Sequence, residues 1–115
     1  MKILVVEDNP DIKELLDYIL QDEGHEVVAC ADGSSVDAID RILPDLILMD
    51  ELLSEVRGST LIKKLKANPA SRKVPVILLS AMPNIQDIAA KCGADGWLEK
   101  PFNIESLTEA VKNFA

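Results

Sequence analysis

The sequence predicts a doubly wound α/β domain with a five-stranded parallel sheet, on the basis of three observations. Short β-branched and aliphatic runs alternate five times with helical apolar patterns along the 115 residues. The runs are nearly continuous in apolar residues, which is typical of parallel strands buried on both faces. No Gly/Ser-rich linker or internal repeat interrupts the alternation. We therefore expect one domain, residues 1–115, with helices on both faces of the sheet.

The first two strands and the helix between them have clear boundaries. Residues 2–6 and 26–31 form the expected strands. Asn9 and Pro10 favour a helix start, as the capping residue and the first helical position, and Gly24 ends that helix. Its predicted inward face follows helical spacing and comprises Ile12, Leu15, Leu16, Ile19 and Leu20.

The pattern continues through the middle of the chain. A second helix is expected to open at Gly33 and to close at Pro44. Its predicted inward residues are Val36, Ile39 and Leu43. A wholly apolar strand, residues 46–49, follows and ends at Asp50.

The remaining elements follow at similar spacing. A third helix is expected to stop near Asn68, and further strands are expected at 74–79 and 96–99. Gly93 ends the fourth helix, and Asn103 caps the fifth. The inward residues predicted for these three helices are Leu61, Ile62 and Leu65; Ile85, Ile88, Ala89 and Cys92; and Ile104, Leu107, Val111 and Phe114.

Five βα units with right-handed crossovers leave few topologies, and the common one is the flavodoxin-like (βα)5 strand order 2-1-3-4-5. A rival order exists. In the predicted order, ligands bind beyond the carboxyl ends of strands one and three, where the winding reverses. The residues delivered to that rim by strands one, three, four and five are Glu7 and Asp8, Asp50, Ser80, and Lys100.

These residue types favour phosphoryl transfer to a carboxylate. Three carboxylates this close repel one another unless a cation lies among them, and oxygen ligands without His or Cys select Mg²⁺ over zinc. Ser80 and Lys100 add a hydroxyl and a positive charge that suit a phosphoryl group. Asp50 is the best acceptor because it stands alone on its strand, whereas Glu7 and Asp8 form a pair suited to the metal.

Composition argues against several other partners. A net charge of −8 disfavours direct binding of nucleic acid and of anionic membranes. No apolar stretch is long enough to span a bilayer, and the chain reaches Glu7 too early for a signal peptide. Cys30 and Cys92 match no metal or redox spacing, so we expect two reduced thiols in a cytoplasmic protein.

Four segments together resemble the receiver domains of bacterial two-component response regulators. They are residues 4–9 (LVVEDN), 45–50 (DLILMD, with Gly58 eight residues later), 75–81 (PVILLSA) and 93–102 (GADGWLEKPF). The resemblance covers Ile3 to Phe114. It implies that Asp50 accepts a phosphoryl group from a histidine kinase or a histidine phosphotransfer protein.

The resemblance also implies roles around Asp50. Asp8 would ligate Mg²⁺ directly, Glu7 would do so through a water, and the backbone carbonyl of Leu52 would be a further ligand. Ser80 and Lys100 would contact the phosphoryl group. The Lys100–Pro101 peptide bond is expected to be cis.

Trp97 occupies the family's switch-aromatic position, where Tyr or Phe is usual. The resemblance implies that Ser80 moves toward the phosphoryl group and that Trp97 rotates into the vacated space; a packing role for Trp97 is the alternative. The helix 85–92, the strand 96–99 and the last helix would signal to an unknown partner or output domain. The same face offers a weak dimer, with a monomer as the other expectation.

Departures from the family pattern affect two loops. Leu53-Ser54 stand where the family often has Met-Pro, so the loop conformation is expected to differ. Leu52 and Met82 follow Asp50 and Ser80 by two residues and offer no acid or amide to orient an attacking water. We therefore expect slow loss of the phosphoryl group.

Three other functions fit the sequence less well. A Mg²⁺-dependent phosphatase with an aspartyl nucleophile, similar to the haloacid-dehalogenase family, would need a second Asp where Leu52 stands. A flavin binder would need a Ser/Thr/Gly-rich phosphate loop where Glu7 and Asp8 stand. A degenerate receiver that acts as a constitutive binding surface is disfavoured because every acceptor-site residue type is present.

Overall fold

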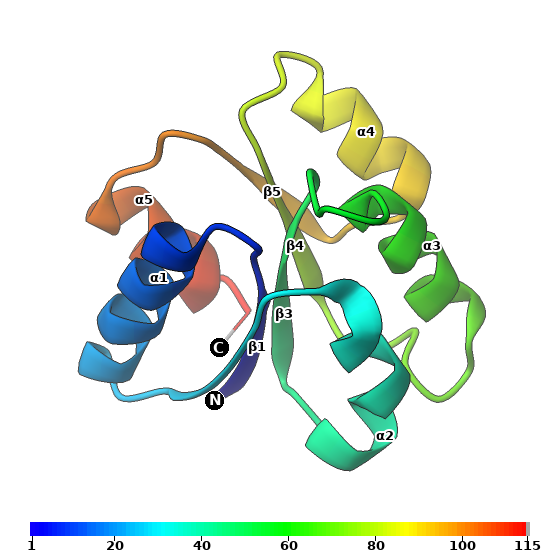
Figure 1. Cartoon of the computed structure of the whole chain (residues 1–115), viewed down its shortest axis with the longest axis horizontal. Helices are drawn as coiled ribbons and strands as arrows, with labels where there is room; N and C mark the ends of the chain where they lie inside the picture. Colours follow the sequence, from blue (N-terminus) through cyan, green and yellow to red (C-terminus); the bar gives the residue numbers. More distant parts are fainter. Residues whose placement is uncertain (115) are drawn as a thin grey trace.

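The computed structural model describes residues 1–114 and contains a five-stranded parallel sheet between two layers of helices (Figure 1). The strand order is β2-β1-β3-β4-β5, which confirms the predicted topology. Each strand is four or five residues long, and the strands are β1 (Lys2–Val6), β2 (Glu26–Cys30), β3 (Leu46–Asp50), β4 (Val76–Ser80) and β5 (Gly96–Glu99).

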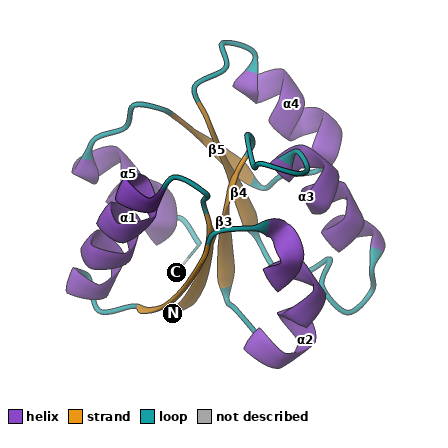
Figure 2. Cartoon of the chain, in the orientation of Figure 1, coloured by secondary structure: helices purple, strands orange, loops and turns teal. Residues whose placement is uncertain are grey.

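The helices divide between the two faces of the sheet (Figure 2). On one face lie α1 (Pro10–Asp22) and α5 (Ile104–Lys112). The other face carries the 3₁₀ helix η1 (Gly33–Ala38), α2 (Ile39–Ile42), α3 (Gly58–Ala67) and α4 (Ile85–Cys92). The two layers explain why β1, β3 and β4 are mainly apolar, since both faces of these strands pack against helices.

Strand residues alternate strictly between the two cores. Ile3 and Val5 of β1 pack with α1 and α5, whereas Leu4 and Val6 pack with the opposite layer. The same alternation runs along β3 and β4 because successive side chains of a strand point to opposite faces. It also determines the direction of the polar residues that follow each strand.

The predicted helix caps at Asn9 and Asn103 are confirmed. The Asn9 Oδ1 atom accepts hydrogen bonds from the backbone N–H groups of Asp11 (3.0 Å) and Ile12 (3.2 Å). Asn103 Oδ1 accepts one from the N–H of Ser106 (2.7 Å). These bonds satisfy N–H groups that have no partner inside the helix and so define where α1 and α5 begin.

The second helical segment differs from the prediction. It begins as the 3₁₀ helix η1 and becomes α-helical only over α2. Leu43, expected inside, has a left-handed backbone (φ 51°) and an exposed side chain. Pro44 disfavours the right-handed helical region for the residue before it, so Leu43 leaves the helix and turns away from the core.

Two further residues predicted to face inward are exposed. Leu15 is 51% exposed and lines, with Ile12 and Phe102, a shallow depression beside Lys100. Ile104 is 57% exposed, because as the first residue of α5 it precedes the part of the helix that packs on the sheet. Helical spacing identified the correct faces but extended them too far.

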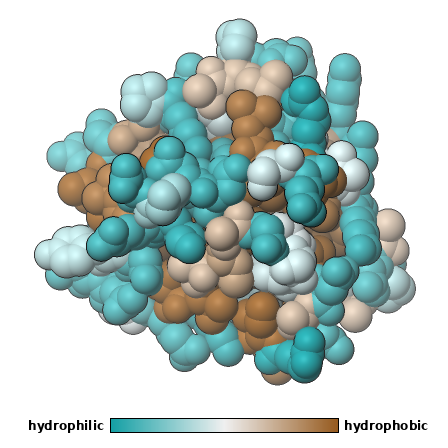
Figure 3. Space-filling view, viewed as in Figure 1, coloured by the Kyte–Doolittle hydropathy of each residue, from teal (hydrophilic) through white to brown (hydrophobic). Residues whose placement is uncertain are grey.

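Hydrophilic residues cover most of the face of the molecule that is on view. Figure 3 shows a mainly hydrophilic face in which the hydrophobic areas are separated from one another. Within residues 1–114 no helix has the length and apolar character needed to cross a membrane.

Candidate functional site

Three carboxylates meet where the first and third strands end. β1 and β3 are neighbours, with Val6 opposite Met49, so the residues that follow them reach the same rim. Oxygen atoms of Glu7, Asp8 and Asp50 all lie within 4.8 Å of one another. The structure therefore places the three predicted acids in one cluster.

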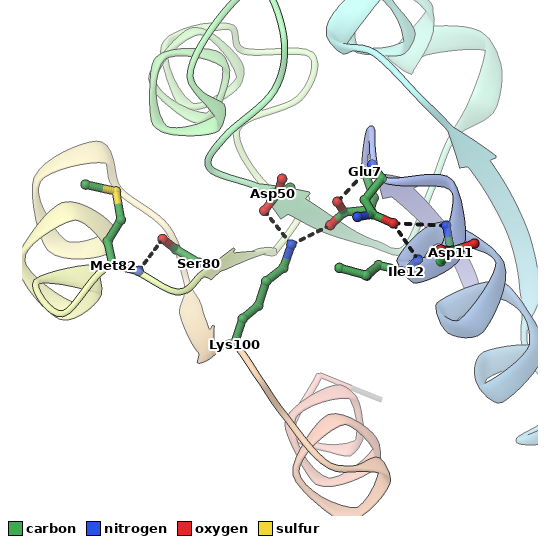
Figure 4. A network of polar contacts seen from close by, with 8 residues as sticks. Glu7, Asp11, Ile12, Asp50, Ser80, Met82 and Lys100 are labelled. Atoms are coloured by element: carbon green, nitrogen blue, oxygen red, sulfur yellow. Dashed lines mark hydrogen bonds and ion pairs between the residues drawn. The ribbon is translucent and has the colours of Figure 1, made fainter.

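Lys100 connects two of these acids (Figure 4). Its Nζ atom lies 2.8 Å from Glu7 Oε2 and 2.8 Å from Asp50 Oδ1. It enters from β5 at the sheet edge, where its backbone N–H donates to the carbonyl of Ser80 at 2.8 Å and its bond to Pro101 is cis. The long side chain spans the end of β4 to reach Asp50.

Strand alternation explains which side chains meet. Asp50 continues the series of Leu46 and Leu48, on the α1 and α5 side of the sheet, and Glu7 continues the corresponding series of β1. Ser80 instead continues the series of Val76 and Leu78, on the α4 side. The hydroxyl of Ser80 accepts a hydrogen bond from the Met82 N–H at 3.0 Å and is turned away from Lys100 (Figure 4).

The cluster combines three carboxylates with the ammonium group of Lys100, so negative charge is in excess. Burial raises the pKa of Asp50, and the charges of Glu7 and Asp8 raise it further, against the hydrogen bond from Lys100. Burial alone would lower the pKa of Lys100, but its bonds to Asp50 and Glu7 raise it overall. Lys100 is therefore held charged, while the ionised form of Asp50 is disfavoured.

This donor set fits a hard cation such as Mg²⁺. It consists of carboxylate oxygens, and Glu7 and Asp50 are buried whereas Asp8 is only half-buried. Leu52, whose backbone carbonyl the resemblance makes a further ligand, lies in the loop directly after this cluster. The site thus offers the oxygen ligands, and the excess negative charge, that a divalent cation would balance.

Trp97 is about half-exposed and lies opposite Leu78 on the neighbouring strand. A pocket on the α5 side of the sheet is lined by Trp97, Ile77 and Phe114. Trp97 lies on β5, three residues before Lys100. One short strand therefore carries Trp97, on the predicted signalling face, and leads directly to Lys100 in the acidic cluster. The switching role stays a prediction.

Glu51 is a residue near the site that was not predicted from the sequence. Its side chain is almost fully buried and binds the start of α3 through Ser59. Two signals were available. Strand alternation directs the residue after Asp50 to the opposite side of the sheet, and Arg57, which precedes α3, is not a usual capping residue.

Replacing Lys100 by Met is expected to lower the free energy of unfolding by about 3 kcal/mol at pH 7 without divalent cations, because the buried carboxylates of Glu7 and Asp50 lose their partly buried partner. Urea unfolding measures the change. Lys64→Met is the matched control, because the Lys64–Asp37 pair is exposed on both sides and its loss should have little effect. Equal losses in both variants would contradict the pairing described for Lys100.

Comparisons with known proteins agree with this geometry. The family model described as "Response regulator receiver domain" matches residues 3–112. The phosphate regulon transcriptional regulatory protein PhoB of Escherichia coli is 35% identical over 114 residues, which cover 96% of this chain and 50% of PhoB. The chain thus spans about half the length of the curated relatives it matches.

Solved structures show the same fold. The chemotaxis protein CheY4 of Vibrio cholerae superposes with a TM-score of 0.90 at 28% identity, covering 99% of this chain and 98% of CheY4. The receiver domain of the sensor histidine kinase PA1611 from Pseudomonas aeruginosa, solved with a magnesium ion coordinated in its active-site cleft, has a TM-score of 0.89 at 30% identity, covering 98% and 95%. The family match, the shared strand order and the acidic cluster lead to one conclusion: the chain belongs to the response regulator receiver domains.

Proposed function

We propose that Asp50 accepts a phosphoryl group, in a Mg²⁺-dependent reaction, from a phosphohistidine of a histidine kinase or a histidine phosphotransfer protein. The observation that carries the proposal is the contact of Lys100 with both Asp50 and Glu7, in a cluster that also contains Asp8. It combines a carboxylate nucleophile, a fixed positive charge and a set of metal ligands at one rim.

In the proposed reaction an Asp50 carboxylate oxygen attacks phosphorus. A P–O bond forms, the P–N bond to the donor histidine breaks, and the electron pair of that bond returns to the imidazole nitrogen. The Lys100 ammonium would orient the Asp50 carboxylate and then interact with the new phosphoryl oxygens. Asp8, Asp50 and the Leu52 carbonyl would hold Mg²⁺ directly and Glu7 would hold it through a water, and the bound ion would supply further positive charge.

The same proposal accounts for signalling. Ser80 is poised at the end of β4, where its hydroxyl contacts the Met82 N–H and would exchange this bond for one to the phosphoryl group. Trp97 would then change its exposure, and the face formed by α4, β5 and α5 would carry the change to a partner, an output domain or a second copy in a weak dimer. Because such a domain takes up and slowly releases its own phosphoryl group, we place it among signalling domains rather than turnover enzymes.

Partners and surroundings are proposals of the same kind. PhoB carries transcriptional regulation in its name, and this chain corresponds to about half of PhoB. The acidic charge of these residues disfavours direct contact with nucleic acid, so any such contact would belong to a further part of a longer protein. A cytoplasmic location stays a prediction.

Incubation with acetyl phosphate and Mg²⁺ tests the proposal. We expect a mass gain of one phosphoryl group by intact-mass spectrometry, and we expect EDTA to prevent it. Absence of any gain with acetyl phosphate and phosphoramidate alike would overturn the proposal. Repeated turnover of a chromogenic phosphate ester would instead favour the phosphatase alternative.

A further inference from the structure

Glu51 is a buried acid outside the cluster described above. It follows Asp50 directly, yet its side chain points to the opposite side of the sheet, toward α3. The Ser59 N–H donates to Oε1 at 2.7 Å, and the Ser59 hydroxyl donates to Oε2 at 2.9 Å. Only 1% of the residue is exposed, so these bonds replace the hydration of a charged group.

The start of α3 depends on this acid. Arg57, the residue before the helix, makes no capping hydrogen bond with its side chain in the described structure. The carboxylate of Glu51 takes that place and meets the positive end of the helix dipole. Glu51, the residue that follows β3, therefore caps a helix that begins seven residues later, at Gly58.

Glu51 also closes the loop between β3 and α3 at its base. The Gly58 N–H donates to the Glu51 carbonyl at 2.9 Å, and Leu52 forms an antiparallel bridge with Arg57. The loop 51–58 is consequently held as a closed ring. Its first residues carry the Leu52 carbonyl, two residues after Asp50 in the chain.

Arg57 adds a weaker connection to the opposite loop. Its Nη1 atom lies 3.8 Å from Glu51 Oε2 and 3.9 Å from the sulfur of Met82. Met82 in turn holds the hydroxyl of Ser80 through its backbone N–H. A series of contacts thus connects Glu51, through Arg57, with Met82 and the loop that follows β4.

We propose that Glu51 is a positioning residue for the cation site: it fixes the loop 51–58 and thereby orients the Leu52 carbonyl toward the ion. The inference rests on the proposed function, because it assumes that the acidic cluster holds Mg²⁺. The Glu51 side chain makes its hydrogen bonds to Ser59, on the side of the sheet opposite the Asp50 side chain. It acts through Ser59 and the loop backbone, in the way outer groups tune metal sites elsewhere.

The test measures Mg²⁺ affinity instead of activity. We would titrate Mg²⁺ into ¹⁵N-labelled protein and follow the amide signals around Asp8 and Asp50. For Glu51→Ala we expect binding weakened about tenfold or more, the range typical for loss of an outer group. Glu51→Gln, which keeps an oxygen acceptor for the Ser59 N–H but loses the charge, should retain most of the affinity.

Two further variants separate positioning from charge. Glu55→Gln removes one negative charge from an exposed position of the same loop and should change the affinity less than about twofold. Ser59→Ala preserves every charge and removes one of the two bonds to Glu51, so we expect an intermediate loss. Ser59→Ala also keeps the test valid if Glu51→Ala does not fold.

The outcomes are distinct. Equal losses in Glu51→Ala and Glu51→Gln would show an effect of charge and overturn the inference. If Mg²⁺ affinity is unchanged in both Ser59→Ala and Glu51→Ala, Glu51 acts only as a structural cap. The same conclusion holds if Glu51→Ala does not fold and Ser59→Ala binds Mg²⁺ with unchanged affinity. If the unsubstituted protein binds no Mg²⁺, the proposed function itself fails, and the two failures are therefore distinguishable.

Discussion

Asp50→Asn is expected to abolish the mass gain from acetyl phosphate. The amide is similar in size to the carboxylate, so the fold is retained, but it lacks the anionic oxygen that attacks phosphorus. Intact-mass spectrometry measures the result under the conditions that phosphorylate the unsubstituted protein. Asp40→Asn, at an exposed position of α2, is the control and should gain one phosphoryl group as before.

A mass gain that persists in Asp50→Asn would show that another residue accepts the phosphoryl group.

The Asp50→Asn variant should also be more stable than the unsubstituted protein without divalent cations. Because the folded-state pKa of Asp50 is raised, stability is fullest when this group is protonated and is lost as the pH rises through that raised pKa. At pH 7 Asn removes this unfavourable charge, so the melting temperature should rise by a few degrees.

Gly58→Ala is expected to cost about 3 kcal/mol of the free energy of unfolding, or to displace the backbone at Asp50. A Cβ atom at this position would clash with the Asp50 carbonyl oxygen and would lie 2.9 Å from the Met49 Cγ atom. The first contact is with backbone, so no side-chain rotation relieves it. Urea unfolding measures the loss, and phosphorylation by acetyl phosphate should slow in parallel.

Gly96→Ala provides the control for that substitution. A Cβ atom on Gly96 would meet ordinary neighbours, the closest being the Phe114 ring at 3.6 Å. Its effect on stability should therefore be small. If Gly58→Ala were as stable as Gly96→Ala, the close approach between the start of α3 and Asp50 would not be a constraint in solution.

Most of the fold could be predicted from local sequence signals. The apolar runs located all five strands, and the Asn caps located two helix starts, because these signals act between neighbouring residues. The predictions of buried residues were wrong where burial depends on the position of the residue in the tertiary structure. Leu15 and Ile104 follow helical spacing, but whether a residue on the correct face is covered depends on how far the sheet extends beneath it.

The candidate site could be predicted to the level of which residues meet. Parallel strands bring Glu7, Asp8 and Asp50 to one rim whatever lies between them in sequence. Strand alternation directs the Ser80 and Glu51 side chains to the side of the sheet opposite Asp50, and this division was not among the predictions made from the sequence. The sequence also could not show that Lys100 bonds to two acids at once, which depends on the reach of one side chain across β4.

The pairing of Lys100 has a thermodynamic consequence for the whole rim. Three carboxylates and one ammonium leave two negative charges, which is the charge that one divalent cation balances. A phosphoryl group on Asp50 would replace the single negative charge of the carboxylate with about 1.5 to 2 negative charges. Cation affinity and the equilibrium constant for phosphorylation of Asp50 should therefore increase each other by the same factor, since the linkage of two equilibria is reciprocal. Free Mg²⁺ concentration would then act as a second input to the domain, alongside its phosphoryl donor.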